Sequence, residues 1–578
     1  MVKRFLLGSV AVTAALAAAV VACAPQTGRE AKAEEKQAVS ASARPPAEES
    51  GLGAYLAGRF AQAHGDTRAA SDYYVAAARH DRENQDLQQR AFTLVLAEGR
   101  LEEAVPMAER LLAIDEDAAL PSIMMGVRDG RDGRYAEAEK HFAVLPQKGI
   151  NGFLGPLLKA WALAGQGKFD DALKMLAPRT DTAGFAPIFD FHAALIADLA
   201  GRTDMAAEHF KASLAAQTSV RTVEAAGAFY QRNGHMDDAA ALYQRYHADH
   251  FDRTLLDGRR QLALGAGMAR TVDSAATGLA EAMFDTASLV RQGNAHDLAM
   301  VFTRLALAAR PDFPVARLLL ADILAQQRRF TESNAIYRAI DPNTQPGRFA
   351  RLRLAVNFDA AGEDEAAIKE LRELSAEWAD GTDSLLTLGD ILRRHKRFPE
   401  AAEAYDQALA RIEAPNDARH WSLYYARGIA LERSRQWARA EKDFLAALHL
   451  SPDQPDVLNY LGYTWVDQGI NLEQGRKMIA RAAELRPKDG AIIDSLGWAL
   501  YRMGEYQVAV KQLERAAELK PEDPTINEHL GDALWQVGRV AEARYQWQRA
   551  MTLDPEPEQI EPLKYKIATG QLPSQPGQ

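Results

Sequence analysis

The stretch LGWALYRMGEYQVAVKQLERAAELKP, Leu496–Pro521, decides the fold of this chain. It is followed by LGDALWQVGRVAEARYQWQRAMTLDP, Leu530–Pro555, in which the same residue types return after 530 − 496 = 34 positions. Both stretches begin with Leu-Gly, carry a glycine in the middle and an alanine five residues later, and end in proline. A pattern that recurs at a fixed period of about 20 to 50 residues indicates a stack of similar structural units.

The same frame runs along most of the chain. Its small residue stands at Ala70, Ala104, Ala138, Ala172, Ala206, Ala239, Ala299, Ser333, Ala367, Ala401, Ala440, Gly475, Ala509 and Ala543. A glycine stands five residues earlier in most units, and Asn294, Arg328, Lys396, Arg435 and Ile470 interrupt that column. Glycine ends a helix in the left-handed conformation, and a small residue lets two helices approach closely. Each unit is therefore predicted to be two helices joined by a short turn, with proline stopping the second helix.

This period and residue pattern resemble the tetratricopeptide repeat. The resemblance covers fourteen candidate units between about Leu52 and Pro557, and the last four match best. It implies an all-α fold, a right-handed superhelix of helical hairpins with a long concave face. Such a solenoid is stabilised by packing between neighbouring units.

One interval breaks the frame. The offset from Ala239 to Ala299 is 299 − 239 = 60 positions, which exceeds one repeat by 26 positions. We therefore predict an N-terminal array in residues 51–246, an irregular helical insert in 247–286 and a C-terminal array in 287–570. Three interpretations of the insert stay open: a hinge, a lid over the groove, or a degenerate repeat.

The first residues have the features of a secretory signal. Lys3 and Arg4 precede an apolar stretch that ends in VVAC at Cys23. That ending resembles a bacterial lipobox, which implies cleavage after residue 22 and lipid attachment to Cys23, whereas an uncleaved membrane anchor is the alternative. Cys23 is the only cysteine of the chain, so no internal disulfide can form.

The segments that flank the repeats differ from them in composition. Residues 23–50 carry the lipidated cysteine and a stretch rich in Ala, Glu, Pro, Ser and Lys, which predicts a disordered tether. Residues 571–578 are predicted to be a disordered tail. Ala24, where an aspartate would resemble an inner-membrane retention signal, favours the outer membrane, facing the periplasm.

No motif in the sequence predicts catalysis. The net charge of −11 argues against a general nucleic-acid or anionic-lipid surface. Walker-type, Rossmann-type and Gly-x-Ser-x-Gly motifs are missing. His247 and His250, beside Asp249 and Asp252, are interpreted as surface residues rather than metal ligands. We predict no catalytic residue, metal, cofactor, nucleic-acid partner or small-molecule substrate.

The concave groove is the remaining candidate site. The first helix of each unit lines the concave face of tetratricopeptide arrays. The frame places seven side chains there: Asn459, Tyr463, Asp494, Trp498, Glu528, Asp532 and Trp535. Aromatic residues among polar and acidic ones suit the capture of an extended peptide or a partner helix. The alternative is that Trp498 and Trp535 pack between neighbouring units.

The sequence combines a signal with a lipobox, a polar tether and a long repeat array. This combination resembles the large outer-membrane lipoproteins that bind a periplasmic carboxyl-terminal processing protease. The resemblance is most persuasive in the block Leu458–Pro555. The resemblance implies a lipid-anchored adaptor that presents peptidoglycan hydrolases to the protease. A scaffold for envelope assembly or exopolysaccharide export is the alternative, and an enzyme built on repeats is disfavoured because no stretch is left for a catalytic domain.

Overall fold

The computed structural model describes residues 50–177, 184–216, 219–249, 268–293, 295–379, 381–412, 415 and 417–572. The predicted signal peptide, Cys23, nearly all of the predicted tether and residues 573–578 lie outside this range. The described part contains 29 α-helices and no strand, which confirms the all-α prediction. Within it, we find no helix that combines the length and the apolar character needed to cross a bilayer.

The described chain forms two compact units, which divide within α19 (Asp364–Glu377) after Ala367. Unit 1 contains α1 (Gly51–Ala63), α2 (Thr67–His80), α3 (Gln85–Ala97), α4 (Leu101–Ile114), α5 (Ala119–Arg131), α6 (Tyr135–Ala143), α7 (Gly149–Gly165), α8 (Phe169–Leu176), α9 (Ala186–Leu199), α10 (Thr203–Ala216), α11 (Val220–Arg232), α12 (Met236–Asp249), α14 (Ala275–Gln292), α15 (His296–Ala309), α16 (Pro314–Gln326), α17 (Phe330–Arg338) and α18 (Gln345–Ala360).

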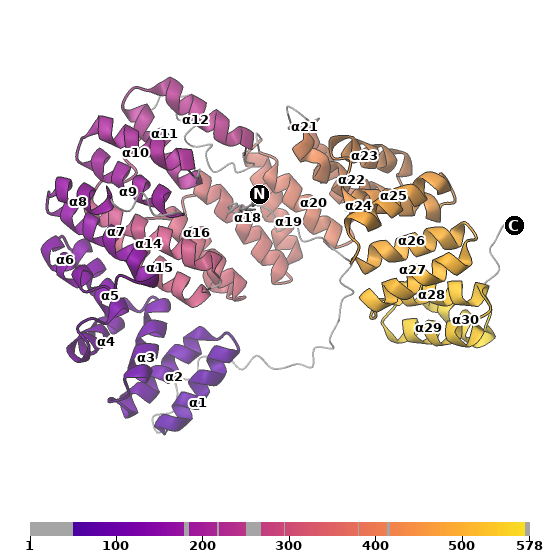
Figure 1. The fold of residues 1–578 in the computed structure, drawn as a ribbon, viewed down its shortest axis with the longest axis horizontal. Coiled ribbons are helices and arrows are strands. Elements are labelled where there is room, and N and C mark those ends of the chain that lie inside the picture. The colour runs from indigo at the N-terminus through magenta and orange to yellow at the C-terminus, as the bar shows by residue number, and fades with distance from the viewer. Residues whose placement is uncertain are drawn as a thin grey trace, which may run out of the picture. The chain divides into compact units, whose positions relative to one another are not determined.

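Unit 2 continues the chain of helices to the C-terminal end (Figure 1). It contains α20 (Asp383–Arg394), α21 (Phe398–Ala410), the 3-10 helix η3 (Ala418–His420), α22 (Trp421–Arg433), α23 (Trp437–Leu450), α24 (Pro455–Asp467), α25 (Leu472–Leu485), α26 (Gly490–Arg502), α27 (Tyr506–Leu519), α28 (Pro524–Gln536), α29 (Val540–Thr552) and α30 (Pro557–Thr569).

Among the described residues, the contacts pair the helices into thirteen hairpins, α1–α2 to α11–α12, α14–α15, α16–α17 and α20–α21 to α28–α29, and α30 follows alone. The turn residue of the predicted frame has positive φ in each array, for example +81° at Gly504. Where the glycine column is interrupted, Arg328, Lys396 and Arg435 adopt the same left-handed conformation at +59°, +59° and +60°. The helices on both sides therefore impose the turn even where the residue disfavours it.

Each hairpin closes through a small residue on each of its helices. The predicted alanine of the second helix is fully buried, as at Ala509. A glycine of the first helix faces a large side chain of the second: a Cβ on Gly531 would lie 2.5 Å from the Trp547 ring. These contacts leave no room for a larger residue, which explains the Leu-Gly pair that recurs in the sequence.

The interval that breaks the frame holds the start of another hairpin. Helix α12 ends at Asp249, residues 250–267 lie outside the described part, and α14 begins at Ala275. The first twelve residues of α14 therefore fall within the predicted insert 247–286. Together with α15, this helix forms a hairpin whose position in unit 1 bears directly on the candidate site.

Candidate partner-binding surface

In unit 1, another hairpin covers the layer of first helices. Helix α14 packs against α5, α7 and α9, and α15 packs against α3 and α5. Those helices are the first helices of four successive hairpins, so α14 and α15 lie against the concave side of the array (Figure 1). We call α14–α15 the cover hairpin. This chain itself therefore occupies part of the first-helix layer of unit 1.

A buried ion pair holds the cover hairpin to the array. Glu281 on α14 is 0 % exposed and accepts hydrogen bonds from the Arg221 guanidinium of α11, one of them at 3.0 Å from Nε. Burial lowers the pKa of Arg221, but the Glu281 carboxylate raises it by more, so the net shift is upward. Arg310 lies 3.7 Å from the same carboxylate. Removal of Glu281 would leave Arg221 with the more distant Glu224, at 3.5 Å, so loss of the hydrogen-bonded pair is unfavourable.

A chain of hydrogen bonds joins the same hairpin to α7 and α9. The indole N–H of Trp161 donates to Nδ1 of His192 at 2.9 Å, and His192 Nε2 lies 3.1 Å from the Asp285 carboxylate of α14. Since Nδ1 accepts, the ring proton is on Nε2 and is donated to Asp285. Gly278 of α14 allows the approach, because a Cβ there would lie 2.2 Å from the Trp161 ring.

A third contact closes unit 1 between residues far apart in sequence. Arg329 Nη2 donates to the Glu98 carboxylate at 2.7 Å, and the Thr67 hydroxyl donates to the same carboxylate at 2.7 Å. Burial raises the pKa of Glu98, but the hydrogen bonds from Arg329 and Thr67 and the nearby guanidinium charges lower it by more. Arg304 of α15 reaches the carbonyl of Ala97 at 3.2 Å. The sequence frame gives no sign of this closure.

In unit 2, two of the seven predicted groove residues, Asp494 and Trp498, belong to one stack of rings. Trp498 on α26 lies between Tyr501, with centroids 4.8 Å apart, and His529 of α28, with centroids 4.1 Å apart. Asp494 accepts from His529 Nδ1 at 3.0 Å. Burial lowers the pKa of His529, but the charge of Asp494 and its hydrogen bond raise it by more. Trp498 therefore packs between neighbouring repeats.

Three further predicted residues are contacted by α30. Lys566, which is 5 % exposed, donates to Glu528 at 2.7 Å and to Asp532 at 2.8 Å. Burial raises the pKa of Asp532 even though Lys566 lowers it in part. The Trp535 indole donates to the carbonyl of Gly570 at 2.9 Å. Residues Glu528, Asp532 and Trp535 thus hold the C-terminal helix.

The remaining part of the predicted groove has polar atoms without a partner. The Oδ1 atom of Asn459 on α24 and the indole N–H of Trp498 on α26 are buried and have no hydrogen-bond partner among the described residues. Tyr463, one turn after Asn459, packs with Trp498 against the cluster of Val466, Ile479 and Ala499. Burial raises the pKa of the Tyr463 phenol, so it stays a neutral hydroxyl. We call Asn459, Tyr463 and Trp498 the open face.

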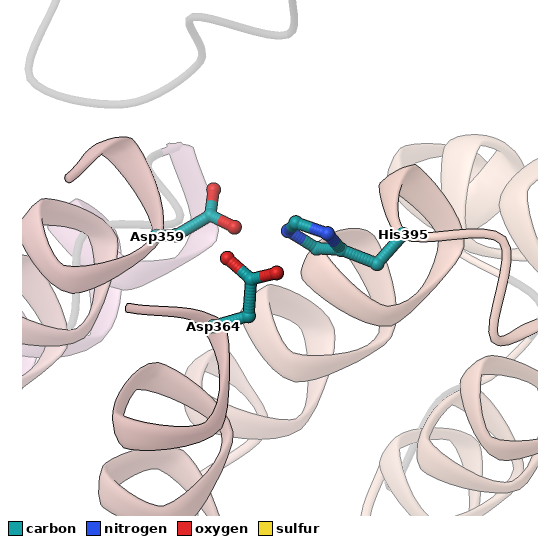
Figure 2. Close-up of side chains that lie close together, drawn as sticks. All are labelled: Asp359, Asp364 and His395. Carbon is teal, nitrogen blue, oxygen red and sulfur yellow. The ribbon is translucent and has the colours of Figure 1, made fainter. Parts of the chain in front are cut away.

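The histidines weighed in the sequence as metal ligands lie outside the described side chains. His247 lies in α12, but its side chain and His250 fall outside the described part. Figure 2 shows the carboxylates of Asp359, on α18, and Asp364, at the start of α19, side by side. The third residue drawn there, His395, belongs to unit 2, so we assign no metal site to this group.

A stack of two-helix hairpins that repeat at a fixed period defines an α-solenoid, a class of fold that presents extended binding surfaces to other proteins. The family description that matches the chain is the tetratricopeptide repeat, at residues 157–219, 352–418, 425–490 and 495–556. These four segments of the chain are therefore tetratricopeptide repeats, and repeats of this kind imply protein partners.

A curated protein from Pseudomonas aeruginosa, the TPR repeat-containing protein PA4667, is 31 % identical to this chain over 174 residues. The match covers 29 % of each chain, so this protein spans less than a third of that relative's length in the match.

Solved structures with similar helices include a tetratricopeptide repeat protein from Parabacteroides merdae, with 13 % identity, a TM-score of 0.37, and coverage of 44 % of this chain and 99 % of that one. The yeast Tom70 structure has 15 % identity, a TM-score of 0.33, and coverage of 90 % and 95 %.

Proposed function

We propose that this protein is a membrane-anchored scaffold of the bacterial cell envelope that holds a segment of a partner protein on the open face of unit 2. One observation carries the location. The cover hairpin occupies the first-helix layer of unit 1, whereas α24 and α26 carry buried polar atoms that have no partner among the described residues. An unpaired buried polar atom is unfavourable, and a bound ligand would satisfy it.

The chemistry of the open face favours recognition of a peptide main chain. The acidic residues nearby already have partners: Asp494 pairs with His529, and Asp532 pairs with Lys566. Asn459 offers an acceptor and Trp498 offers a donor. An extended peptide presents N–H and C=O groups in alternation, so both atoms would gain hydrogen bonds without a requirement for charge.

The proposed anchor is the lipid on Cys23, and the proposed site of action is the periplasmic side of the outer membrane. The apolar stretch that ends in VVAC and the polar residues up to Ser50 support this proposal. Replacement of Cys23 by serine should release the protein into the soluble periplasmic fraction with its helical circular dichroism unchanged. A Cys23→Ser variant that stays in the membrane fraction would contradict lipid anchoring.

We further propose that the protein acts as an adaptor without catalysis of its own, which brings peptidoglycan hydrolases to a carboxyl-terminal processing protease. The plan of signal, tether and repeats in the sequence supports this role. So does the well-formed C-terminal run of repeats, which includes the open face.

The proposal can be tested by photo-crosslinking in cells. A benzoylphenylalanine at position 463 would lie on the open face, and the matched control would replace Tyr545, which is 61 % exposed on α29. We expect adducts at position 463 that mass spectrometry identifies as a processing protease or a cell-wall hydrolase, and none at 545. Adducts with export or assembly proteins would replace the adaptor role by the scaffold alternative. Equal adducts at both positions would contradict the open face as the site.

A further inference from the structure

Three large apolar side chains form an exposed stripe on the first helix. Leu52, Leu56 and Phe60 of α1 are 69 %, 55 % and 66 % exposed. Residues four apart on a helix lie on one face, so the three side chains form a continuous strip along α1. Two of these exposed fractions are higher than that of any other large apolar residue in the described part.

This stripe lies at the end of the solenoid, where another repeat would otherwise pack. Terminal repeats of a solenoid usually present a polar outer face, because no neighbour covers them. At the other end of the described chain, α30 provides such a termination and buries Lys566 against α28. Helix α1 instead leaves its apolar side chains in solvent, which points to a ligand that covers them.

The charge on α1 differs from that of the chain as a whole. The protein has 79 acidic and 68 basic residues, whereas α1 has no acidic residue. Arg59 stands beside Phe60 and is exposed, and the His64 ring lies 4.0 Å from the Phe60 ring. An apolar stripe with a neighbouring cation and no carboxylate suits the boundary between lipid headgroups and acyl chains.

The position of α1 in the chain also favours a membrane surface as its partner. The helix follows Ser50, which stands 50 − 23 = 27 positions after the proposed lipidated cysteine. A chain of that length reaches at most about 95 Å when fully extended, at roughly 3.5 Å per residue. Of all described helices, α1 is the nearest to the anchor along the chain.

We propose that the exposed face of α1 lies on the surface of the bilayer that anchors the protein, with Leu52, Leu56 and Phe60 at the acyl boundary. The Arg59 guanidinium extends to the headgroups, since a long basic side chain keeps its charge in water while its stem is buried. This second contact adds to the lipid and fixes which end of unit 1 faces the membrane. The choice of a bilayer as the partner rests on the proposed anchoring at Cys23.

The test uses the chain from Ala24 onward with Cys23 absent, so that no lipid is attached. Co-sedimentation is measured with vesicles of phosphatidylethanolamine and phosphatidylglycerol at a ratio of 3:1. We compare the parent chain, a variant with Leu52→Ser, Leu56→Ser and Phe60→Ser, and a control with Val508→Ser, Leu519→Ser and Val540→Ser, which are also exposed residues. Helical circular dichroism confirms that all three proteins are folded.

We expect the parent and the control to sediment with vesicles, and the α1 variant to bind at least tenfold more weakly. A parent chain that stays in solution, or an α1 variant that binds as the parent does, would overturn the proposal. A parent that is dimeric in light scattering, becomes monomeric in the α1 variant and ignores vesicles would assign the stripe to a second copy. A negative result in the vesicle assay would not contradict lipid anchoring at Cys23, because fractionation of the Cys23→Ser variant tests that anchoring separately.

Discussion

Two tryptophans occupy the same place in their repeats but have different surroundings. Trp161 stands six residues before the turn glycine Gly167, and Trp498 stands six residues before Gly504. Each contacts a histidine at an equivalent position of the next hairpin, His192 or His529. Unit 1 and unit 2 therefore place the same pair of side chains at the first-helix layer.

The two pairs differ in what completes them. In unit 1, Trp161 donates to His192, and Asp285 of the cover hairpin accepts from that histidine. In unit 2, His529 turns to Asp494 and stacks on Trp498, whose N–H is left without a partner among the described residues. In unit 1 the cover hairpin thus completes the tryptophan–histidine pair, whereas in unit 2 the indole N–H of Trp498 has no partner among the described residues.

The largest expected change in stability comes from loss of the ion pair that holds the cover hairpin. Replacement of Glu281 by alanine removes both hydrogen bonds to the buried Arg221 guanidinium and leaves it the more distant Glu224, which should cost up to about 3–5 kcal/mol of stability in unit 1. Hydrogen exchange followed by mass spectrometry should show loss of protection in α14 and in the helices it covers. Glu102→Ala, an exposed position on α4, should change stability by less than about 0.5 kcal/mol. Equal protection in the two variants would show that the cover hairpin does not depend on the ion pair.

A smaller effect separates the two tryptophans. Trp161→Phe deletes the donor to His192 and leaves a buried acceptor unsatisfied, whereas Trp498→Phe deletes an N–H that has no partner among the described residues. Both variants lose ring volume, so the difference between them isolates the hydrogen bond. We expect Trp161→Phe to be less stable than Trp498→Phe by about 1–3 kcal/mol in urea unfolding. The reverse order would contradict the distinction between covered and open repeats.

The histidine of the open side gives a pH dependence. Because the fold raises the pKa of His529, the protonated ring contributes stability that is complete below about pH 6.5, the ordinary histidine pKa. This contribution is lost as the pH rises through the folded-state value. The stability difference between the parent and His529→Gln should therefore shrink from pH 6 to pH 9. The exposed His449→Gln serves as the control, and a difference that grows with pH would refute the Asp494–His529 pair.

The smallest expected change in stability concerns a turn between two helices, not the candidate binding surface. Arg435 has φ of +60°, which costs a side-chain residue about 1–2 kcal/mol, and glycine removes that cost at the expense of greater freedom in the unfolded chain. We expect Arg435→Gly to stabilise unit 2 by about 0.5–1 kcal/mol. Arg433→Gly, at the end of helix α22, should destabilise it by a similar amount. A melting temperature that falls in both variants would contradict the imposed left-handed turn.

The repeat frame predicted the hairpins because its signal is local. The glycine and alanine columns fix each turn and each close approach within a single repeat, and the left-handed residues at Arg328, Lys396 and Arg435 lie where the frame expects glycine. The extra residues between Ala239 and Ala299 fall where α12 ends and the cover hairpin begins. A sequence period contains only the features that neighbouring repeats share, so it predicts the stacked hairpins well.

The cover hairpin and the C-terminal helix could not be read from the same signal. The Glu98–Arg329 contact joins residues 231 positions apart, and no periodic pattern links them. Glu281 looks like an ordinary helix-surface carboxylate until α11 is placed against it. Lys566 was within reach of the frame, since 566 − 532 = 34 puts it one repeat after Asp532. The binding role of the seven groove residues stays a prediction.

Hydrogen exchange of the indole N–H protons tests the difference between Trp161 in unit 1 and Trp498 in unit 2. The chain has eight tryptophans, so ¹⁵N-indole labelling gives a spectrum in which Trp161→Phe and Trp498→Phe assign the two resonances. We predict strong protection at Trp161, where the N–H is bonded and covered, and exchange at least a hundredfold faster at Trp498. Equal protection of both protons in the free protein would contradict the account of one covered and one open array.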